Sequence, residues 1–486
     1  MVGMRRWGLI VAAAAALAAP VAQAQAPLQV GAVTPELLTR KLVPGTVAAL
    51  RAANLADAAR VTVTWRRGQT SIDLNLLADL RYGINAAERA GAEVYLTVYP
   101  DGSAQTPLSF ADQGTFAQFA AWLVKRLPDV EHVIVGNEPN MNRFWFPQFG
   151  AGGSDLAAPA YARLLARTYD AIKAASPAVE VVGGALAHRG GDVPGTRRDT
   201  HSPTTFLLDM GKAYRASGRT RPIMDAFAYH PYLEQSDFPP TYQHLMSSTI
   251  ITIGDYGKLV SALRRAFDGT TQAGSTLPIV YAEFGVESRV PPSLTSLYTG
   301  IEPATTHPVD EATQARYYAQ AMQLATCQPT VRTFLVFRLI DSPQLSDWQS
   351  GPYYADGTPK SSRAAIAAAA RRARTGIATG CAALLTPKPF VSFFPVTRPG
   401  PKIGIQPLLL RCNEDCNYSI RLVRLGKKTQ PLVVFRGKVT AGQTAHPRVP
   451  RAPLTRGYYR LSMRVTAADY PANAFSASRV FRIRRS

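Results

Sequence analysis

The chain has 486 residues, of which 46% are hydrophobic and 18% are charged, and its formal net charge is +21. This length allows two or three domains, and the apolar content can build substantial cores, which excludes a chain without packed structure. After the first 24 residues no stretch reaches the ~18 consecutive apolar residues that a transmembrane helix needs, so the sequence predicts no membrane span.

The amino terminus has the pattern of a secretory signal peptide. Arg5 and Arg6 precede an apolar run over residues 9–19, and Ala22-Gln23-Ala24 supplies the small residues of a cleavage site. The apolar run is too short to span a membrane. We therefore predict that residues 1–24 are a signal peptide, cleaved after Ala24 with Ala26 as the alternative, and that the mature protein is secreted to the extracellular side.

Short apolar runs then alternate with segments whose apolar residues recur at helical spacing. The runs lie at 28–33, 60–65, 92–98, 130–136, 179–185, 224–229, 277–282 and 331–339. The helical segments lie at 46–56, 76–90, 116–126, 160–175, 204–217, 256–267, 310–326 and 361–374. This alternation predicts the α/β class, as a (β/α)8 TIM barrel over residues 27–380. The alternative, an open doubly wound sheet, would require a Gly-rich phosphate-binding turn after its first strand, and the sequence has none there.

Two of the apolar runs end in a glutamate. Val-Ile-Val-Gly-Asn-Glu-Pro-Asn at 133–140 contains Glu138, and Pro-Ile-Val-Tyr-Ala-Glu-Phe-Gly at 278–285 contains Glu283. Because parallel barrel strands open at their carboxyl ends onto one mouth, carboxylates placed there usually perform chemistry. Glycoside hydrolysis requires two facing carboxyl groups, one to protonate the leaving oxygen and one to attack or to activate water. Either glutamate alone could be an ordinary ion-pair partner, but the pair favours catalysis.

These residues carry a family resemblance. Asn137-Glu138-Pro139 and Ala282-Glu283-Phe284-Gly285 resemble the signatures of the retaining glycoside hydrolases of clan A, whose cellulase-like and β-xylosidase-like families share this barrel. The segments 60–65, 229–232 and 356–360 also resemble the clan's sequences in the same order, so the likeness covers about residues 28–375. It implies Glu138 as acid/base after strand four and Glu283 as nucleophile after strand seven, with no cofactor and no metal.

The resemblance also suggests supporting residues. An acid must hold its proton near neutral pH, which burial beside a second carboxylate favours, whereas Glu283 must stay ionised to attack. Arg60 and Tyr232 would each donate a hydrogen bond to Glu283 and favour its charged form. Asn137 could hydrogen-bond the hydroxyl next to the anomeric carbon. His230 could donate to a sugar hydroxyl or orient a carboxylate, or it could be an ordinary satisfied histidine.

Aromatic residues are the candidates for sugar contacts. The clan commonly ends strand eight in a tryptophan beneath the sugar, but this chain has Phe337 there, so either this phenyl ring or the nearby Trp348 could form the floor. Trp145 and Phe146, just after the acid/base loop, could stack on sugar faces or pack within their loop.

The sequence changes character after residue 375. Residues 385–399 are Pro-rich, and alternating runs follow at 418–423, 431–439, 457–465 and 479–483, which predicts a small all-β immunoglobulin-like sandwich over 386–486. This segment holds 19 Lys or Arg against 3 Asp or Glu, or +16 of the chain's +21. It could hold the protein on an anionic cell-surface polymer, or be a solvated spacer. Nucleic acid is not expected, because no nucleic-acid motif accompanies the charge.

Because disulfides form in the oxidising environment outside the cell, the four cysteines of an exported protein are expected to form disulfides. Cys412 and Cys416 are close enough to close a local loop, and Cys327 could pair with Cys381. Four cysteines allow three connectivities, and the sequence does not choose among them. Neither the spacing nor flanking histidines support a zinc site.

Two functions are therefore considered. The first is a retaining glycosidase that cleaves O-glycosidic bonds of a β-linked poly- or oligosaccharide, for which we expect carboxyl groups about 5 to 5.5 Å apart. The second is a barrel that binds glycans without cutting them, anchored by its basic sandwich. The sequence does not indicate the sugar, the linkage, endo or exo action, or the oligomeric state.

Overall fold

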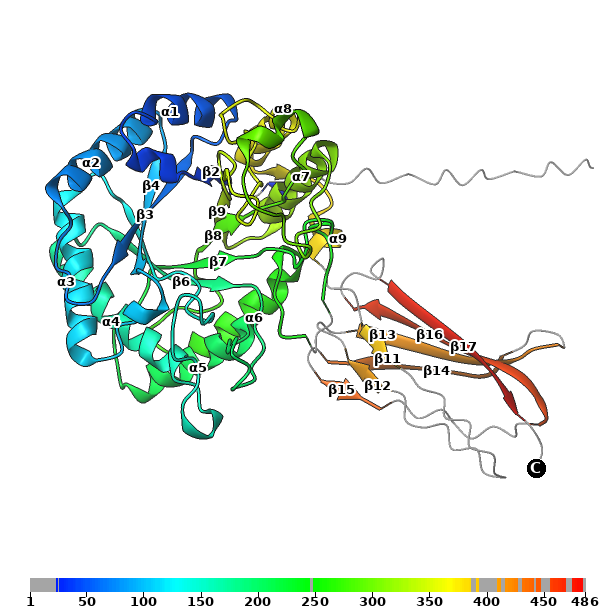
Figure 1. Cartoon of the computed structure of the whole chain (residues 1–486). Helices are drawn as coiled ribbons and strands as arrows, with labels where there is room; N and C mark the ends of the chain where they lie inside the picture. Colours follow the sequence, from blue (N-terminus) through cyan, green and yellow to red (C-terminus); the bar gives the residue numbers. More distant parts are fainter. Residues whose placement is uncertain are drawn as a thin grey trace, which may run out of the picture.

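The computed structural model describes residues 23–24, 26–244, 248–385, 390–392, 409–411, 416–426, 431–440, 443–446, 455–468 and 474–483. Eight parallel strands close into a barrel in chain order, which confirms the predicted fold class (Figure 1). These strands are β2 (Gln29–Val33), β3 (Ala58–Trp65), β4 (Glu93–Pro100), β5 (His132–Val135), β6 (Glu180–Ala187), β7 (Ala226–His230), β8 (Ile279–Phe284) and β9 (Val331–Val336).

Helices surround the barrel and follow its strands in turn. They are α1 (Val43–Ala52), α2 (Leu74–Arg89), α3 (Phe110–Arg126), α4 (Ala157–Ala175), α5 (Pro203–Ala216), α6 (Tyr256–Phe267), α7 (Glu311–Cys327) and α8 (Arg363–Arg374). Several begin earlier than the apolar spacing predicts, because a polar side chain caps the first turn. Ser109 accepts from the N–H of Asp112 at the start of α3, for example, and Asp73 caps α2 in the same way.

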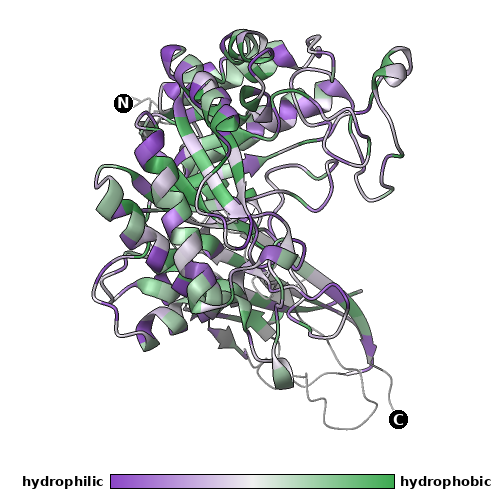
Figure 2. Ribbon diagram, turned by 60° about the vertical axis from the view of Figure 1, so that its left-hand side comes forward, coloured by the Kyte–Doolittle hydropathy of each residue, from purple (hydrophilic) through white to green (hydrophobic). Residues whose placement is uncertain are grey.

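Two apolar layers hold the barrel together. Side chains such as Ala58, Tyr95 and Val280 fill its interior, while a larger core lies between the strands and the helices. Figure 2 shows hydrophobic residues along the barrel strands and a mixture of hydrophobic and hydrophilic residues on the helices around them. Among the helices of the described residues, none is both long and apolar enough to cross a membrane.

The described residues of the carboxyl-terminal part form antiparallel β-sheets, as predicted. Strands β14 (Pro431–Val439), β13 (Cys416–Arg424), β16 (Gly457–Ala467) and β17 (Ala474–Ile483) form one antiparallel sheet. A smaller sheet contains β11 (Phe390–Ser392), β12 (Leu409–Arg411) and β15 (Thr444–Ala445). Leu410 of the small sheet belongs to the same apolar cluster as Ile420 and Tyr459 of the large one, so the two sheets share a core.

The structure chooses one of the possible cysteine pairings. Cys327 at the end of α7 is bonded to Cys381 at the start of α9 (Cys381–Leu385), with their Cα atoms 5.1 Å apart. Cys412 lies outside the described residues, so its pairing with Cys416 stays a prediction.

The predicted signal peptide also lies largely outside the described residues. Gln23–Ala24 forms the short strand β1, which pairs with β10 (Ile377–Ala378). Cleavage after Ala24 would remove this pair. Export and the cleavage site stay predictions.

Candidate active site

The backbone after β5 makes a sharp turn that places Glu138. Gly136 has a φ of +96°, and a Cβ at this position would lie 2.9 Å from the Tyr161 ring, so the turn requires glycine. Glu138 itself has a φ of +40°, which is uncommon for a non-glycine residue and is found at functional sites. Its N–H donates to the carbonyl of Ala185 at 2.7 Å, which fixes the turn against β6.

Glu283 lies within β8, in the part of the barrel where the carboxyl ends of the strands meet. Its Oε1 accepts from Nη1 of Arg60 at 2.6 Å, and its Oε2 accepts from the Tyr232 hydroxyl at 2.9 Å. Burial alone raises the pKa of this carboxyl, but His230, the Arg60 guanidinium and the Tyr232 hydrogen bond outweigh burial. The pKa of Glu283 is therefore below its ordinary value, and the side chain is ionised at neutral pH.

Arg60 connects three elements of the mouth. It is 2% exposed, and its Nε donates to Oγ1 of Thr97 on β4 at 2.7 Å. Nη2 donates to Oδ1 of Asn137 at 3.0 Å, while Nη1 reaches Glu283. Because Oδ1 of Asn137 accepts from a guanidinium, the amide nitrogen of Asn137 is left to donate elsewhere.

His230 brings the two glutamates together. Its Nδ1 lies 3.1 Å from Oε1 of Glu138 and 3.5 Å from Oε2 of Glu283, and the side chain is fully buried. Both neighbours are acceptors, so the proton belongs on Nδ1. Nε2 is buried without a hydrogen-bond partner. An oxygen of Glu138 and an oxygen of Glu283 lie within 4.8 Å of each other.

The same three side chains have a geometry that could also hold a metal ion. However, both oxygens of Glu283 already accept hydrogen bonds, and the Arg60 cation 2.6 Å from Oε1 would repel a second cation. The donor set therefore fits a carboxylate pair with cationic support better than a metal centre.

Aromatic rings lie beside the nucleophile candidate. Trp348 stacks on Tyr232 with ring centroids 4.6 Å apart, and it meets Phe337 edge-to-face at 5.4 Å. Both Trp348 and Phe337 are half-buried. The structure thus brings both candidates for the sugar floor to the same place. The last barrel strand is shorter than the apolar run at 331–339 predicts. Strand β9 ends at Val336, so Phe337 lies just beyond the sheet.

Trp145 requires a correction. Its side chain is 1% exposed and packs edge-to-face on Tyr161 of α4, with centroids 5.8 Å apart, so it presents no face to a sugar. The alternative of packing within the protein is the one the structure supports. Its neighbour Phe146 is 56% exposed.

Two residues near the site were not predicted from the sequence. His188 follows β6 with its ring centroid 6.2 Å from that of Tyr232, and both of its nitrogens are buried without a hydrogen-bond partner. Burial, reinforced by the charge of Arg189, lowers its pKa to about 3. Tyr99 on β4 lies within the electrostatic influence of Arg60 and Glu283, and burial raises its pKa. Neither residue belongs to a recognisable motif, so the sequence carried no signal for them.

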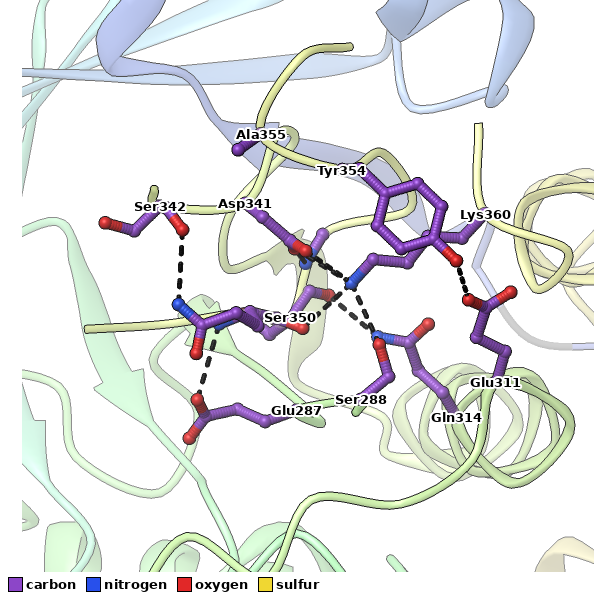
Figure 3. A network of polar contacts seen from close by, with 12 residues as sticks. Glu287, Ser288, Glu311, Gln314, Asp341, Ser342, Ser350, Tyr354, Ala355 and Lys360 are labelled. Atoms are coloured by element: carbon purple, nitrogen blue, oxygen red, sulfur yellow. Dashed lines mark hydrogen bonds and ion pairs between the residues drawn. The ribbon is translucent and has the colours of Figure 1, made fainter. Parts of the chain in front are cut away.

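A buried polar network braces the loops that carry the aromatic residues (Figure 3). The ammonium of Lys360 lies 2.8 Å from Oδ2 of Asp341 and donates to Oγ of Ser288 and to the carbonyl of Gln349, both at 2.9 Å. These partners come from the loops after β8 and β9. Lys360, the last residue of the Asp-Gly-Thr-Pro-Lys turn, therefore fixes the segment that includes Trp348.

Comparisons with known proteins give distant likenesses only. No protein-family model matches the chain, and no curated protein matches it. Among solved structures, the Bacteroides uniformis beta-glucuronidase is 10% identical, with a TM-score of 0.45 over 94% of this chain and 46% of that one, so this chain spans about half its length.

Two further structures are similar. GH5_18 from Streptomyces cattleya, solved in complex with GlcNAc, is 16% identical, with a TM-score of 0.49 over 72% of this chain and 81% of that one. The endo-beta-1,4-mannanase from Thermotoga petrophila is 8% identical, with a TM-score of 0.43 over 96% and 99% of the two chains. At such low identity and TM-score, the function of this chain has to be inferred from its own side chains.

Proposed function

We propose that this chain is a secreted retaining glycoside hydrolase that cleaves O-glycosidic bonds by double displacement, with Glu283 as nucleophile and Glu138 as acid/base. The observation that carries the proposal is the different support of the two carboxylates. Glu283 is held ionised by Arg60 and Tyr232, whereas Glu138 contacts neither of them in the hydrogen-bond network and instead faces Nδ1 of His230.

The separation of the two carboxylates supports retention. One oxygen of each lies within 4.8 Å of the other, which fits the roughly 5 to 5.5 Å of retaining enzymes better than the ~6.5–9.5 Å that leaves room for a water. In the first step, an oxygen of Glu283 attacks the anomeric carbon while Glu138 gives its proton to the leaving oxygen. In the second step, Glu138 takes a proton from water, which attacks the glycosyl-enzyme and frees Glu283.

The neighbouring side chains have defined parts in this scheme. The free amide nitrogen of Asn137 would donate to the hydroxyl next to the anomeric carbon, a contact that strengthens in the oxocarbenium-like transition state. Nδ1 of His230 would move its hydrogen bond between the two carboxylates as their charges change. The rings of Phe337 and Trp348 would form the floor under the sugar. The resemblance of the segments around Glu138 and Glu283 to clan A favours a β-linked poly- or oligosaccharide as substrate, and the aromatic floor fits a sugar ring.

Azide rescue tests the two roles separately. Glu138→Ala should keep glycosylation by an activated aryl glycoside, which needs little protonation, but lose the ~10²–10⁴-fold that acid catalysis supplies for natural substrates. Azide should rescue this variant and give a glycosyl azide of retained configuration. Glu283→Ala should lose activity for every leaving group, and any azide rescue should give the inverted product.

The control is Glu131→Gln, which removes a carboxylate at the amino end of β5, where the Glu131 side chain is 65% exposed. It should retain wild-type rates. Exchange of the two azide products between the variants would mean that the roles are reversed. No turnover of any glycoside by the wild-type protein, together with measurable glycan binding, would replace the proposal with the non-catalytic glycan-binding alternative.

A further inference from the structure

The large sheet of the carboxyl-terminal part has one face that is not used for packing. Along β13, Cys416, Ile420 and Leu422 are buried in the shared core, while Asn417, Ser419 and Arg421 point to the other side. Strand register extends this outward side across β14 and β16. We call it the basic face and define it by the residues Asn417, Ser419, Arg421, Arg436, Lys438, Arg464 and Thr466.

The register arranges cations and short polar side chains in rows. Ser419 pairs with Arg436 on one side and with Arg464 on the other, so two guanidinium groups flank one hydroxyl. In the next row, Asn417 lies between Lys438 and Thr466. Neighbouring strands are ~4.8 Å apart and successive outward residues ~6.8 Å apart, so these groups lie within one small area. The two rows line a surface depression of about 490 Å³.

The positive charge of this face is not neutralised by its own sheet. The four strands contain no Asp and no Glu. Arg421, Arg436, Lys438 and Arg464 are all exposed, and within the described part of the chain none of them forms an ion pair. Like charges held this close repel one another, which costs stability unless an anion binds between them.

We propose that the basic face binds an acidic polysaccharide, with its cations on the carboxylate or sulfate groups and the side chains of Asn417, Ser419 and Thr466 on the sugar hydroxyls. The side chains that lie between the cations indicate which class of anionic polymer binds. Single-stranded nucleic acid would require outward aromatic rings for base stacking. Among the described residues that line the depression, the one aromatic ring is that of Tyr418, and it packs edge-to-face on Phe435 against the shared core instead of standing on the outward side. A membrane surface would require several outward apolar side chains beside the cations. The rows of Ser419 and Asn417 present none, and the row of Arg421 adds one, Val434, which is 43% exposed.

Binding can be measured independently of catalysis. The full-length protein carrying Glu283→Gln is titrated with polygalacturonate and with alginate at low and at physiological salt, with dextran as the neutral probe. Both acidic polymers should bind, more weakly as salt rises, and dextran should not. Each exposed ion pair contributes up to about 5-fold, so Arg436→Ser/Arg464→Ser should weaken binding by up to about 25-fold.

The matched control is Arg479→Ser. Arg479 is also exposed, but it pairs with the buried Leu461, so it lies on the opposite side of the same sheet. Arg479→Ser should change the affinity for the acidic polymers by less than 2-fold, which is about the smallest contribution of one exposed ion pair. The proposal is overturned if neither acidic polymer binds, if Arg479→Ser weakens binding as much as the double variant, or if single-stranded DNA of equal charge binds more tightly than the polysaccharides.

Discussion

Replacement of Arg60 by glutamine should move the acidic limb of the pH–rate profile upward. Arg60 lies 2.6 Å from Oε1 of Glu283, and both side chains are buried. An opposite charge at such a distance lowers a carboxyl pKa by about 1–3 units. Glu283 must be ionised to attack, and its pKa is below the ordinary value in the wild type. Without the guanidinium, ionisation should require a pH higher by about 1–3 units, so activity should be lost at a higher pH.

The same substitution should also reduce stability. A carboxyl whose pKa is lowered by folding adds stability above its unfolded pKa, and this contribution disappears as the pH falls through the folded value. Arg60→Gln leaves Glu283 buried without its cation, which costs about 3–5 kcal/mol when a buried pair is broken. The difference from wild type should therefore be large at pH 7 and shrink toward acidic pH. Urea unfolding at several pH values measures it.

The assay is the pH dependence of kcat/KM with an aryl glycoside, which reports the ionisations of the free enzyme. Thr97→Val is the control, because it removes only the acceptor of the Arg60 Nε hydrogen bond and leaves the charge beside Glu283. Its acidic limb should stay near the wild-type position. If Arg60→Gln lowers the rate but leaves the acidic limb unmoved, Arg60 orients Glu283 without controlling its ionisation, and the electrostatic reasoning is wrong.

Three further predictions concern other buried groups. The pKa of His188 is about 3 in the folded chain and near 6.5 in the unfolded chain, so wild type loses stability as the pH falls below 6.5. In urea unfolding, His188→Leu should therefore be more stable relative to wild type at pH 4.5 than at pH 7. An increase in KM for glycosides would identify His188 as a substrate contact. Lys360→Met leaves Asp341 buried without its cation and should lower the unfolding free energy by about 3–5 kcal/mol. If the broken ion pair is the cause, the double variant Lys360→Met/Asp341→Asn should recover part of this loss. The double variant Cys327→Ser/Cys381→Ser removes the disulfide that joins two residues 54 positions apart, and it should lower the unfolding free energy by up to about 4 kcal/mol. An unchanged denaturation midpoint would show that the disulfide does not constrain the unfolded chain.

Much of the barrel could be predicted from the sequence because its elements are local patterns. Each strand is an apolar run of the length that a buried parallel strand needs, and each helix has its own apolar period, so type and order follow from short windows. The placement of Glu138 and Glu283 at strand ends follows in the same way. Boundaries were less accurate, because caps such as Ser109 extend helices beyond the apolar pattern.

The contacts within the site depend on the closed barrel instead. Glu138 and Glu283 are 145 residues apart in the chain, and only the closure of the sheet brings their oxygens within 4.8 Å. The burial of Trp145 against Tyr161 and the unpartnered nitrogens of His188 result from packing between distant segments. The choice of Cys327–Cys381 likewise results from the distance between α7 and α9. The sequence by itself determined which chemical groups stand at the strand ends, and the tertiary structure decided which of them meet, because side-chain contacts depend on distances that no local pattern contains.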